Sequence, residues 1–273
     1  QADVVLAVGT ELAETDYDFF FLGDLNIQGK LIRIDIDSAQ LMRNHKPTLP
    51  IISEAQQALD AINKQLPINS HRNSDAVYAR CSKLRADTQD MKKSAYGNFF
   101  KTITETLGDC IIVGDSTQPA YYAQAYYETS HTARYFHSTT GYGTLGYAFP
   151  AAIGAAIGAP HLPVIGLTGD GGGQFSLNEI ISAVDANIPV IYLVWNNQGH
   201  AEIRRFMDDA KVEKTGVDII PPNYVALAIA MGCQATHANT LAELKAALTK
   251  AKSHGAPFLI ELDESALDCG YAF

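Results

Sequence analysis

Two apolar runs separated by an amphipathic stretch mark the centre of the chain. Val164–Thr168 and Ile188–Trp195 are rich in Val, Ile and Leu, and each has the length of a buried strand. Between them, the apolar residues of Leu177–Val184 recur at helical spacing. Ser176, followed three residues later by Glu179, has the sequence of a capping box at a helix start. The pattern therefore predicts strand, turn, helix and strand, which is one βαβ unit with parallel strands.

Glycine-rich and polar segments follow these two predicted strands. Gly169–Gly173 (GDGGG) follows the first strand and Asn196–Gly199 (NNQG) follows the second. Ligands of a βαβ unit collect at the carboxyl ends of its strands, and glycines let the backbone approach a phosphate closely. Asp170 offers a carboxylate, Asn197 an amide oxygen and Gly199 a main-chain carbonyl, and such hard oxygen donors suit Mg²⁺. We therefore expect magnesium and a phosphorylated ligand at this edge of the sheet.

The order Gly-Asp-Gly, helix, strand, Asn-Asn resembles the cofactor signature of thiamine-diphosphate-dependent enzymes. An ordinary Asp-Gly turn and a polar strand end are the alternative interpretation. The resemblance implies that Asp170 and Asn197 bind Mg²⁺ through their side chains and that Gly199 binds it through its carbonyl. It also implies that the diphosphate lies against the backbone of Gly169, Gly171 and Gly172, with the amides of the last two facing it.

The first part of the chain has the pattern of the end of a Rossmann-like α/β domain, over residues 1–66. Strands are expected at Asp3–Val8, Lys30–Ile36 and Pro50–Ser53, and a helix is expected at Glu54–Leu66. The segments ADVVLAVGTEL and LIRIDIDSAQ resemble the end of the central domain of acetolactate synthase-like enzymes. That domain binds FAD in some members of the family and no nucleotide in others, so the resemblance allows FAD without requiring it.

Asp35 and Asp37, at the end of the second of these strands, are candidates for contact with a ribose, although acids are common at strand ends. Residues 67–75 (PINSHRNSD) are polar and open with proline, which predicts a linker. The chain begins with Gln1 inside a strand-like run, so we expect it to be part of a longer protein.

A second domain is expected over residues 76–273. It should open with helices at Ala76–Met91 and Gly97–Leu107 and a strand at Cys110–Gly114. The polar turn DSTQP follows this strand, and similar loops in the resembled family contact the diphosphate. The resemblance therefore assigns Thr117 and Gln118 to the cofactor site. Capping of the next helix by Ser116 or Thr117 is the alternative, and the two roles are compatible.

The segment Thr139–Pro150 (TTGYGTLGYAFP) resembles the loop that binds the aminopyrimidine ring of the cofactor. The resemblance implies that the Gly143 carbonyl accepts from the amino group of this ring and that the Leu145 amide faces a ring nitrogen. The Leu145 side chain would lie between the two rings and keep the cofactor bent, which brings the groups that exchange a proton together. A glycine-rich lead-in to a helix is the alternative interpretation.

Three further features carry expectations. His200 stands where many relatives have an aromatic residue, so it is either a substrate-side acid or base or a plain replacement of a tyrosine. Asp208–Asn223 is charged and marked by Gly and Pro, which predicts a mobile cover over the cofactor. Ala148–Ala159 is too short to span a bilayer, and its Gly154 and Gly158 predict a close contact between helix and sheet.

Composition excludes some classes of partner. With 30 acidic and 20 basic residues the net charge is −10, which argues against nucleic acid and against an anionic membrane surface. The four cysteines lack CxxC spacing, which predicts reduced thiols, mostly core filler, in a cytoplasmic protein. They are Cys81, Cys110, Cys233 and Cys269.

These patterns predict an α/β fold, a doubly wound parallel sheet preceded by a partial Rossmann-like domain. The resemblance implies an acetolactate synthase-like enzyme that uses thiamine diphosphate and Mg²⁺ to decarboxylate a 2-oxo acid, with or without carboligation, as a homodimer or homotetramer. The glutamate that activates the cofactor in this family belongs to a pyrimidine-binding domain outside this chain, so the catalytic residue is unassigned and the isolated chain is expected to be inactive. A non-catalytic cofactor-binding or interaction module of the same fold is one alternative. A Mg²⁺-dependent phosphate-ester enzyme is another.

Overall fold

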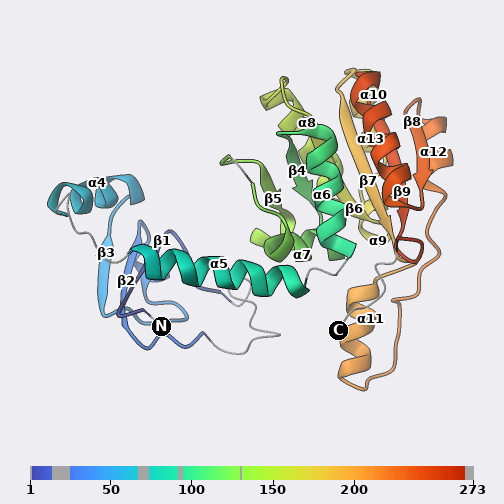
Figure 1. The fold of residues 1–273 in the computed structure, drawn as a ribbon. Helices are drawn as coiled ribbons and strands as arrows, with labels where there is room; N and C mark the ends of the chain where they lie inside the picture. Colours follow the sequence, from blue (N-terminus) through green and yellow to red (C-terminus); the bar gives the residue numbers. More distant parts are fainter. Residues whose placement is uncertain (1, 14–24, 67–73, 92–94, 130, 268–273) are drawn as a thin grey trace. The chain divides into compact units, whose positions relative to one another are not determined.

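The computed structural model describes residues 2–13, 25–66, 74–91, 95–129 and 131–267. The chain divides into two compact units, Gln1–Tyr78 and Ala79–Phe273 (Figure 1). No helix in the described ranges combines the length and the apolar character needed to cross a membrane. His71 and Arg72 of the predicted linker, and Cys269, lie outside the described residues.

The first unit contains a three-stranded parallel sheet in the order β1-β2-β3. Its strands are β1 (Val4–Val8), β2 (Lys30–Asp35) and β3 (Leu49–Ile52), and its helices are α3 (Ser38–Leu41) and α4 (Ala55–Gln65). The predicted strands and the predicted helix therefore form, with ends shifted by at most one residue. Arg33 is buried, and its guanidinium donates to the carbonyls of Arg43 and Thr10 at 2.6 and 2.7 Å, which joins two loops to the sheet.

The two acids considered for ribose contact make local hydrogen bonds. Asp37 accepts from the Ala39 amide at 2.8 Å and thereby caps α3. Asp35 accepts from the Asp37 amide at 2.9 Å. Both carboxylates thus already have a structural role at the end of β2, and a role in nucleotide binding stays a prediction.

The second unit contains a six-stranded sheet in the order β5-β4-β6-β7-β9-β8, with every neighbouring pair parallel. The strands are β4 (Ile111–Gly114), β5 (Tyr135–His137), β6 (Val164–Gly169), β7 (Val190–Asn196), β8 (Gln234–Ala238) and β9 (Phe258–Asp263). The helices are α5 (Ser74–Met91), which crosses the division between the units, α6 (Ala95–Leu107), α7 (Gln118–Tyr126), α8 (Ala148–Gly158), α9 (Asp170–Gly173), α10 (Glu179–Asp185), α11 (Ala201–Asp209), α12 (Tyr224–Ala230) and α13 (Leu241–His254).

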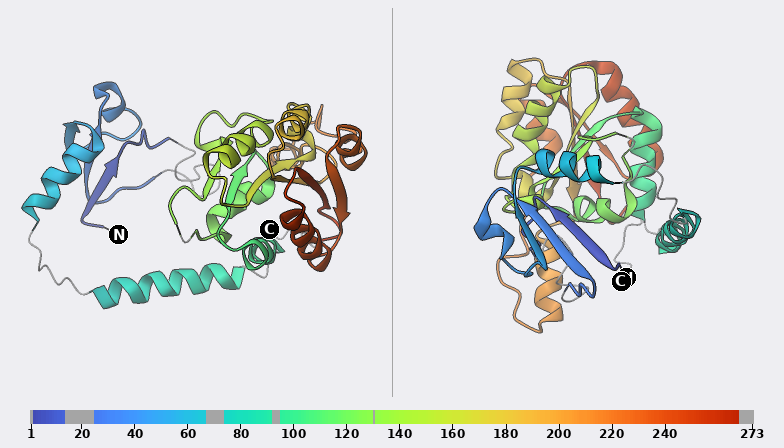
Figure 2. Two further views of the ribbon diagram at one scale, coloured as in Figure 1. Left: turned by 90° about the horizontal axis from the view of Figure 1, so that it is seen from above. Right: turned by 90° about the vertical axis from the view of Figure 1, so that its left-hand side faces the viewer.

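Helices cover both faces of this sheet because its central strands are apolar on both sides (Figures 1 and 2). Along β7, Ile191, Leu193 and Trp195 join the apolar cluster formed with α6, α7 and α13. The alternate residues Tyr192 and Val194 join a second cluster formed with α8, α10 and α12. Each large apolar side chain buried in this way contributes about 1.5–3 kcal/mol to folding. The doubly wound parallel sheet predicted from the sequence is confirmed.

The strand order places a topological switch between β4 and β6. From β4 the chain moves outward to β5, and it then returns past β4 to form β6 on the other side. Loops that leave the two strands in opposite directions open a crevice at their carboxyl ends, where ligands of such sheets bind. The segments Asp115–Gln118 and Gly169–Gly173 meet at this position.

The two edge strands β5 and β8 were missed by the sequence analysis. Neither has a continuous apolar run, and β8 (QATHA) is half-exposed. His237 lies within β8.

The predicted capping box is wrong. Residues 175–178 form turns, and α10 begins only at Glu179, with Asn178 at its N-cap. The Ser176 hydroxyl instead donates to the Gly146 carbonyl at 2.5 Å, so it ties the loop after β6 to the loop before α8.

The predicted role of two glycines in α8 is also wrong. A side chain added at Gly154 or Gly158 would meet no atom within 4 Å, so neither glycine contacts the sheet. The close approach depends on Gly166 of β6, where an added Cβ would lie 3.1 Å from both the Ala148 carbonyl and the Ala152 side chain. Helix α8 therefore packs closely because the strand, and not the helix, lacks a side chain.

Candidate functional site

The ends of β6 and β7 meet at the carboxylate of Asp170. This residue is 1% exposed, and it is the first residue of the single turn α9. One carboxylate oxygen accepts from the Gly199 amide at 2.9 Å, and the other accepts more weakly from the Asn197 amide at 3.4 Å. Burial raises the pKa of the Asp170 carboxyl, and these backbone amides oppose the shift. The two loops that the sequence analysis paired are therefore held together by the predicted metal ligand.

Asn197 brings a second oxygen to this position. Its Oδ1 atom is buried and has no hydrogen-bond partner among the described residues, while its Nδ2 donates to Gln118 Oε1 at 3.1 Å. A buried amide oxygen without a partner is costly unless a ligand or water satisfies it. An oxygen-seeking cation beside Asp170 would satisfy it.

Gly199 needs to be glycine at this place. Its φ is +142°, and an added Cβ would lie 2.5 Å from the Val217 carbonyl and 2.8 Å from the Arg204 side chain. The sharp backbone turn keeps the peptide of Gly199 against Asp170. Metal coordination by its carbonyl stays a prediction.

The glycines of the first loop permit close contacts with three neighbouring segments. An added Cβ would lie 3.0 Å from the Thr117 hydroxyl at Gly169, 2.6 Å from the His200 ring at Gly171, and 3.3 Å from the Leu145 side chain at Gly172. A larger residue would therefore fill the space between loops. Gly169, Gly171 and Gly172 line a cavity with backbone alone, which suits close approach by a diphosphate.

The turn after β4 supplies Thr117 and Gln118, which are 6% and 4% exposed. Thr117 occupies the N-cap position of α7, but its side chain makes no capping hydrogen bond. The capping alternative is therefore not supported by the Thr117 side chain. Gln118 bridges two groups, because its Oε1 accepts from Asn197 and its Nε2 donates to Glu202 at 3.4 Å.

The loop with Gly143 and Leu145 lies beside this turn. Gly143 has a φ of +64°, and its carbonyl accepts from the Ser116 hydroxyl at 3.1 Å. That carbonyl was expected to accept from the cofactor, and its second lone pair is the one left for that bond. The Leu145 side chain reaches over Gly172 towards the glycine turn.

A single cavity is lined by every predicted site residue except Gly143. The structure thus brings together residues from four separate segments, although their individual roles stay predictions. His200 lines the same cavity with its ring against Gly171, and its backbone amide donates to the Val217 carbonyl at 2.9 Å. Val217, within the segment expected to form a mobile cover, is buried.

The sequence analysis missed three acidic residues near this cavity. Glu202 lines it and accepts from Arg205 Nη2 at 2.5 Å. Glu264, just beyond β9, accepts from the Trp195 indole at 2.6 Å and from the Asn197 side chain. Burial raises the pKa of the Glu264 carboxyl, and these two hydrogen bonds oppose the shift.

The third missed acid, Asp115, is fully buried at the end of β4. One of its carboxylate oxygens accepts from the Gly146 amide at 2.9 Å and from the Thr168 hydroxyl at 3.0 Å. The other accepts from the Ser116 amide at 2.8 Å. The carboxylate therefore joins three segments that border the cavity, and burial raises its pKa.

These residues fit a magnesium–diphosphate ligand. The donor set has one carboxylate, one amide oxygen and one main-chain carbonyl, which leaves positions for phosphate oxygens and water, as Mg²⁺ prefers. Within the described residues, no cluster of three or more His, Cys, Asp or Glu side chains could hold a metal ion. A donor set of oxygen atoms alone suits a hard cation, such as Mg²⁺ or Mn²⁺, that shares its coordination with a phosphorylated ligand.

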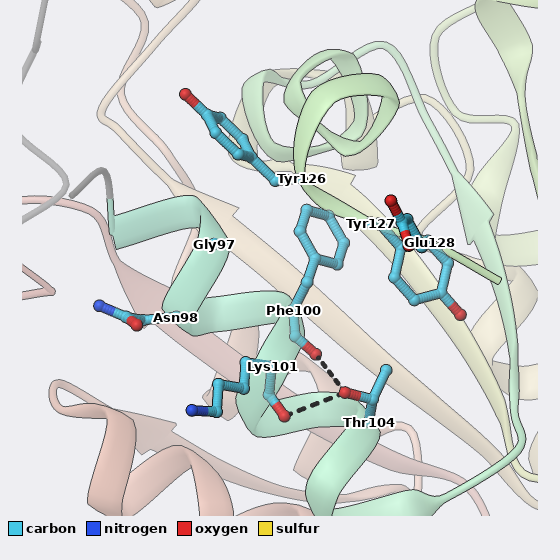
Figure 3. Close-up of a pocket in the computed structure, with 8 residues that line it drawn as sticks. All are labelled: Gly97, Asn98, Phe100, Lys101, Thr104, Tyr126, Tyr127 and Glu128. Atoms are coloured by element: carbon cyan, nitrogen blue, oxygen red, sulfur yellow. Dashed lines mark hydrogen bonds between the residues drawn. The ribbon is translucent and has the colours of Figure 1, made fainter. Parts of the chain in front are cut away.

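A larger cavity, of about 410 Å³, lies elsewhere, between α6 and the end of α7 (Figure 3). Its lining includes Lys101, Tyr126 and Glu128 but none of the predicted site residues. The Thr104 hydroxyl there donates to the Phe100 and Lys101 carbonyls of its own helix, both at 3.1 Å (Figure 3). This cavity is therefore distinct from the one that the predicted site residues line.

Comparison with known proteins gives two family matches. Residues 115–262 match the thiamine pyrophosphate enzyme C-terminal TPP binding domain, and residues 1–62 match the thiamine pyrophosphate enzyme central domain. A probable 2-ketoarginine decarboxylase of Pseudomonas aeruginosa is 35% identical over 96% of this chain and 47% of its own length. The large subunit of acetolactate synthase isozyme 3 of Escherichia coli is 26% identical over 94% of this chain and 47% of its own length.

A solved structure has the same fold. The thiamine diphosphate-dependent 4-hydroxybenzoylformate decarboxylase of Rhodococcus jostii superposes with a TM-score of 0.71 at 22% identity, over 96% of this chain and 48% of that one. The chain thus spans about half the length of the relatives it matches. Since the C-terminal model alone covers more than half of its residues, the chain belongs to the thiamine pyrophosphate enzyme family.

Proposed function

We propose that this chain is the cofactor-binding part of a thiamine-diphosphate- and Mg²⁺-dependent enzyme that decarboxylates a 2-oxo acid, with or without carboligation. The observation that carries the proposal is the meeting of Asp170, Asn197 and Gly199, where the buried Asn197 Oδ1 has no hydrogen-bond partner among the residues that the structure describes. When bound, the cofactor supplies a carbon nucleophile and an electron sink for decarboxylation.

The chain's own residues would bind and orient the cation and the cofactor. Asp170 and Asn197 would hold the cation through side-chain oxygens, and Gly199 would hold it through its carbonyl. The backbone of Gly169, Gly171 and Gly172, together with Thr117 and Gln118, would receive the diphosphate. The Gly143 carbonyl and Leu145 would fix the pyrimidine end. His200 lines the cavity on the side of α11 and is the candidate for contact with substrate, or else a replacement of a tyrosine.

Calorimetry and thermal melting with thiamine diphosphate and Mg²⁺ test the site. We expect the pair to raise the melting temperature of the chain, and we expect Asp170→Ala to abolish this rise. Asp170→Asn is the matched variant, because it keeps an acceptor for a backbone amide but removes the charge that binds the cation. An unchanged rise in both variants would show that the cofactor is held elsewhere.

The same measurement separates the alternatives. A cofactor-dependent rise is expected for an enzyme and for a non-catalytic module, but not for a phosphate-ester enzyme that uses Asp170 alone. Release of carbon dioxide from 2-oxo acids by the full-length protein distinguishes the first two. We propose a guanidino-bearing 2-oxo acid as the first substrate to test beside pyruvate, branched and aromatic acids, because a probable 2-ketoarginine decarboxylase is 35% identical over 96% of the chain.

We further propose that the protein is a homodimer or homotetramer in the cytoplasm. The proposal rests on the family resemblance, and Ile203, which lines the cavity, is 49% exposed. Light scattering of the full-length protein measures its oligomeric state, and a monomer at micromolar concentration would contradict the proposed assembly. We also propose the end of a central domain at residues 1–66, a linker at 67–75 and a cofactor-binding domain at 76–273. FAD binding by residues 1–66 is tested by the flavin absorbance of the purified protein.

A further inference from the structure

An asparagine amide can bind a cation only if its oxygen, and not its nitrogen, faces the ion. The two ends of the group have nearly the same shape, so their surroundings determine the orientation. For Asn197, the Nδ2 atom has two hydrogens, and two acceptors lie beside it. These are Gln118 Oε1 at 3.1 Å and the carboxylate of Glu264. Oδ1 is buried and has no hydrogen-bond partner in the described part of the chain.

The orientation of Gln118 is determined in turn by Glu202. Gln118 Nε2 donates to Glu202 Oε2 at 3.4 Å, and Glu202 Oε1 accepts from Arg205 at 2.5 Å. A guanidinium only donates and an ionised carboxylate only accepts. Gln118 must therefore direct its nitrogen to Glu202 and its oxygen to Asn197.

The orientation of Glu264 is determined from the other side by Trp195. The indole N–H donates to Glu264 Oε2 at 2.6 Å, and an indole can only donate. The Glu264 backbone amide donates to the Asn196 carbonyl at 3.0 Å, which fixes this residue beside the end of β7. The Glu264 carboxylate also accepts from the Asn197 side chain.

We infer that these six side chains form a relay whose donor-only ends, Arg205 and Trp195, fix the Asn197 oxygen towards the cation, with Glu202, Gln118 and Glu264 as positioning residues. The inference rests on the proposed function, since it assumes that Asn197 is a metal ligand. It assigns Glu202 and Glu264 a role that requires no contact with substrate or cofactor. Partners of metal ligands typically change affinity by about 10–100-fold when they are altered.

Two substitutions on opposite sides of Asn197 test the relay. In Glu264→Gln, the new amide must offer its oxygen to Trp195, so its nitrogen meets the nitrogen of Asn197. In Glu202→Gln, Arg205 takes the new amide oxygen, so Gln118 must reverse and present its nitrogen to Asn197. Both changes favour the wrong orientation of Asn197, although the altered residues lie on different elements.

The measurement is the dissociation constant of Mn²⁺, a paramagnetic substitute for Mg²⁺, determined by electron paramagnetic resonance in the presence of thiamine diphosphate. We expect each variant to weaken Mn²⁺ binding by about tenfold or more, with an unchanged melting temperature of the ligand-free protein for Glu202→Gln. Glu261→Gln is the matched control. Glu261 accepts from Asn196 at 2.8 Å through the same kind of Asn–Glu pair one residue away, so its Mn²⁺ affinity should stay within twofold of the unaltered protein.

The outcomes separate the two proposals. If the unaltered chain binds Mn²⁺ and both relay variants bind it within twofold, the relay is wrong and the metal site stands. If the control weakens binding as much as the relay variants, the effect is a general loosening of the sheet edge, and the relay is again wrong. If the unaltered chain binds no Mn²⁺, the proposed function fails and the relay fails with it.

Discussion

The carboxylate of Asp115 accepts from the Gly146 amide at 2.9 Å and so joins the end of β4 to the loop that carries Leu145. The same oxygen accepts from the Thr168 hydroxyl at the end of β6. One buried acid therefore sets the spacing between the turn proposed for the diphosphate and the loop proposed for the pyrimidine ring. Its function is structural, but the site depends on it.

Asp115→Asn is expected to destabilise the second unit. The amide keeps one acceptor but places an N–H₂ group where either the Ser116 amide or the Gly146 amide donates. Two buried N–H groups that face each other without an acceptor cost about 1–3 kcal/mol in the free energy of unfolding. Urea unfolding followed by the fluorescence of Trp195, the single tryptophan of the chain, measures the loss in this unit alone.

Asp109→Asn provides the comparison for that variant. Asp109 accepts from Arg134 at 2.7 Å, but the pair lies near the surface, where water replaces a lost hydrogen bond. Its unfolding free energy should stay close to that of the unaltered protein. Equal losses for the two variants would show that Asp115 is not held as the hydrogen bonds indicate.

Gly199→Ala is expected to disrupt the end of β7. The added methyl would lie 2.5 Å from the Val217 carbonyl, and the φ of +142° is unfavourable for alanine. Clash and strain together should cost about 3 kcal/mol in the same urea experiment. Gly216→Ala separates the two causes, because its φ is +70° with nothing within 4 Å, so only strain of about 1 kcal/mol is expected.

Gly154→Ala is expected to stabilise the protein. Gly154 lies inside α8, is exposed, and has no atom within 4 Å of an added Cβ. Alanine in a helix interior is favoured over glycine by about 0.5–1 kcal/mol. A rise in the urea midpoint tests this. Gly166→Ala is the opposing variant, since its Cβ would lie 3.1 Å from α8, and it should lower the midpoint.

The central strands could be predicted because burial on both faces leaves a continuous apolar run in the sequence. β6 and β7 are buried over nearly their whole length, and both were predicted. The edge strands β5 and β8 are short and partly exposed. Their formation depends on pairing with β4 and β9, which cannot be seen in their own sequences. The prediction for the glycines of α8 was wrong for a related reason. The small residue at the contact between α8 and the sheet is Gly166 of β6, and the sequence does not show which strand lies against the helix.

Some site residues could be predicted from local sequence and others could not. Asp170 and Asn197 lie in short sequence motifs that can be recognised without the structure, and the structure brings the two together. Glu264 has no motif, and its contact with Asn197 depends on β9 lying beside β7, an order that only the fold reveals. One signal was available, since Glu264 lies just beyond the apolar run that forms β9, at the carboxyl edge where the other candidate residues lie.

Burial predicts which cysteine thiols react with a disulfide reagent. Cys110 and Cys233 are buried, and burial raises the pKa of each thiol to about 11, whereas Cys81 is exposed. Only the thiolate reacts with disulfide reagents, so a raised pKa keeps the buried pair unreactive at pH 8. We expect Ellman's reagent to modify Cys81 quickly in the native protein and Cys110 and Cys233 only after unfolding. Rapid labelling of Cys110 or Cys233 at pH 8, identified by mass spectrometry of the modified peptides, would contradict the packing of the second unit.

The raised pKa of the two buried thiols also predicts how stability depends on pH. Because the folded state keeps these protons above the unfolded pKa of about 9, the free energy of unfolding should fall as the pH rises from 9 towards 11.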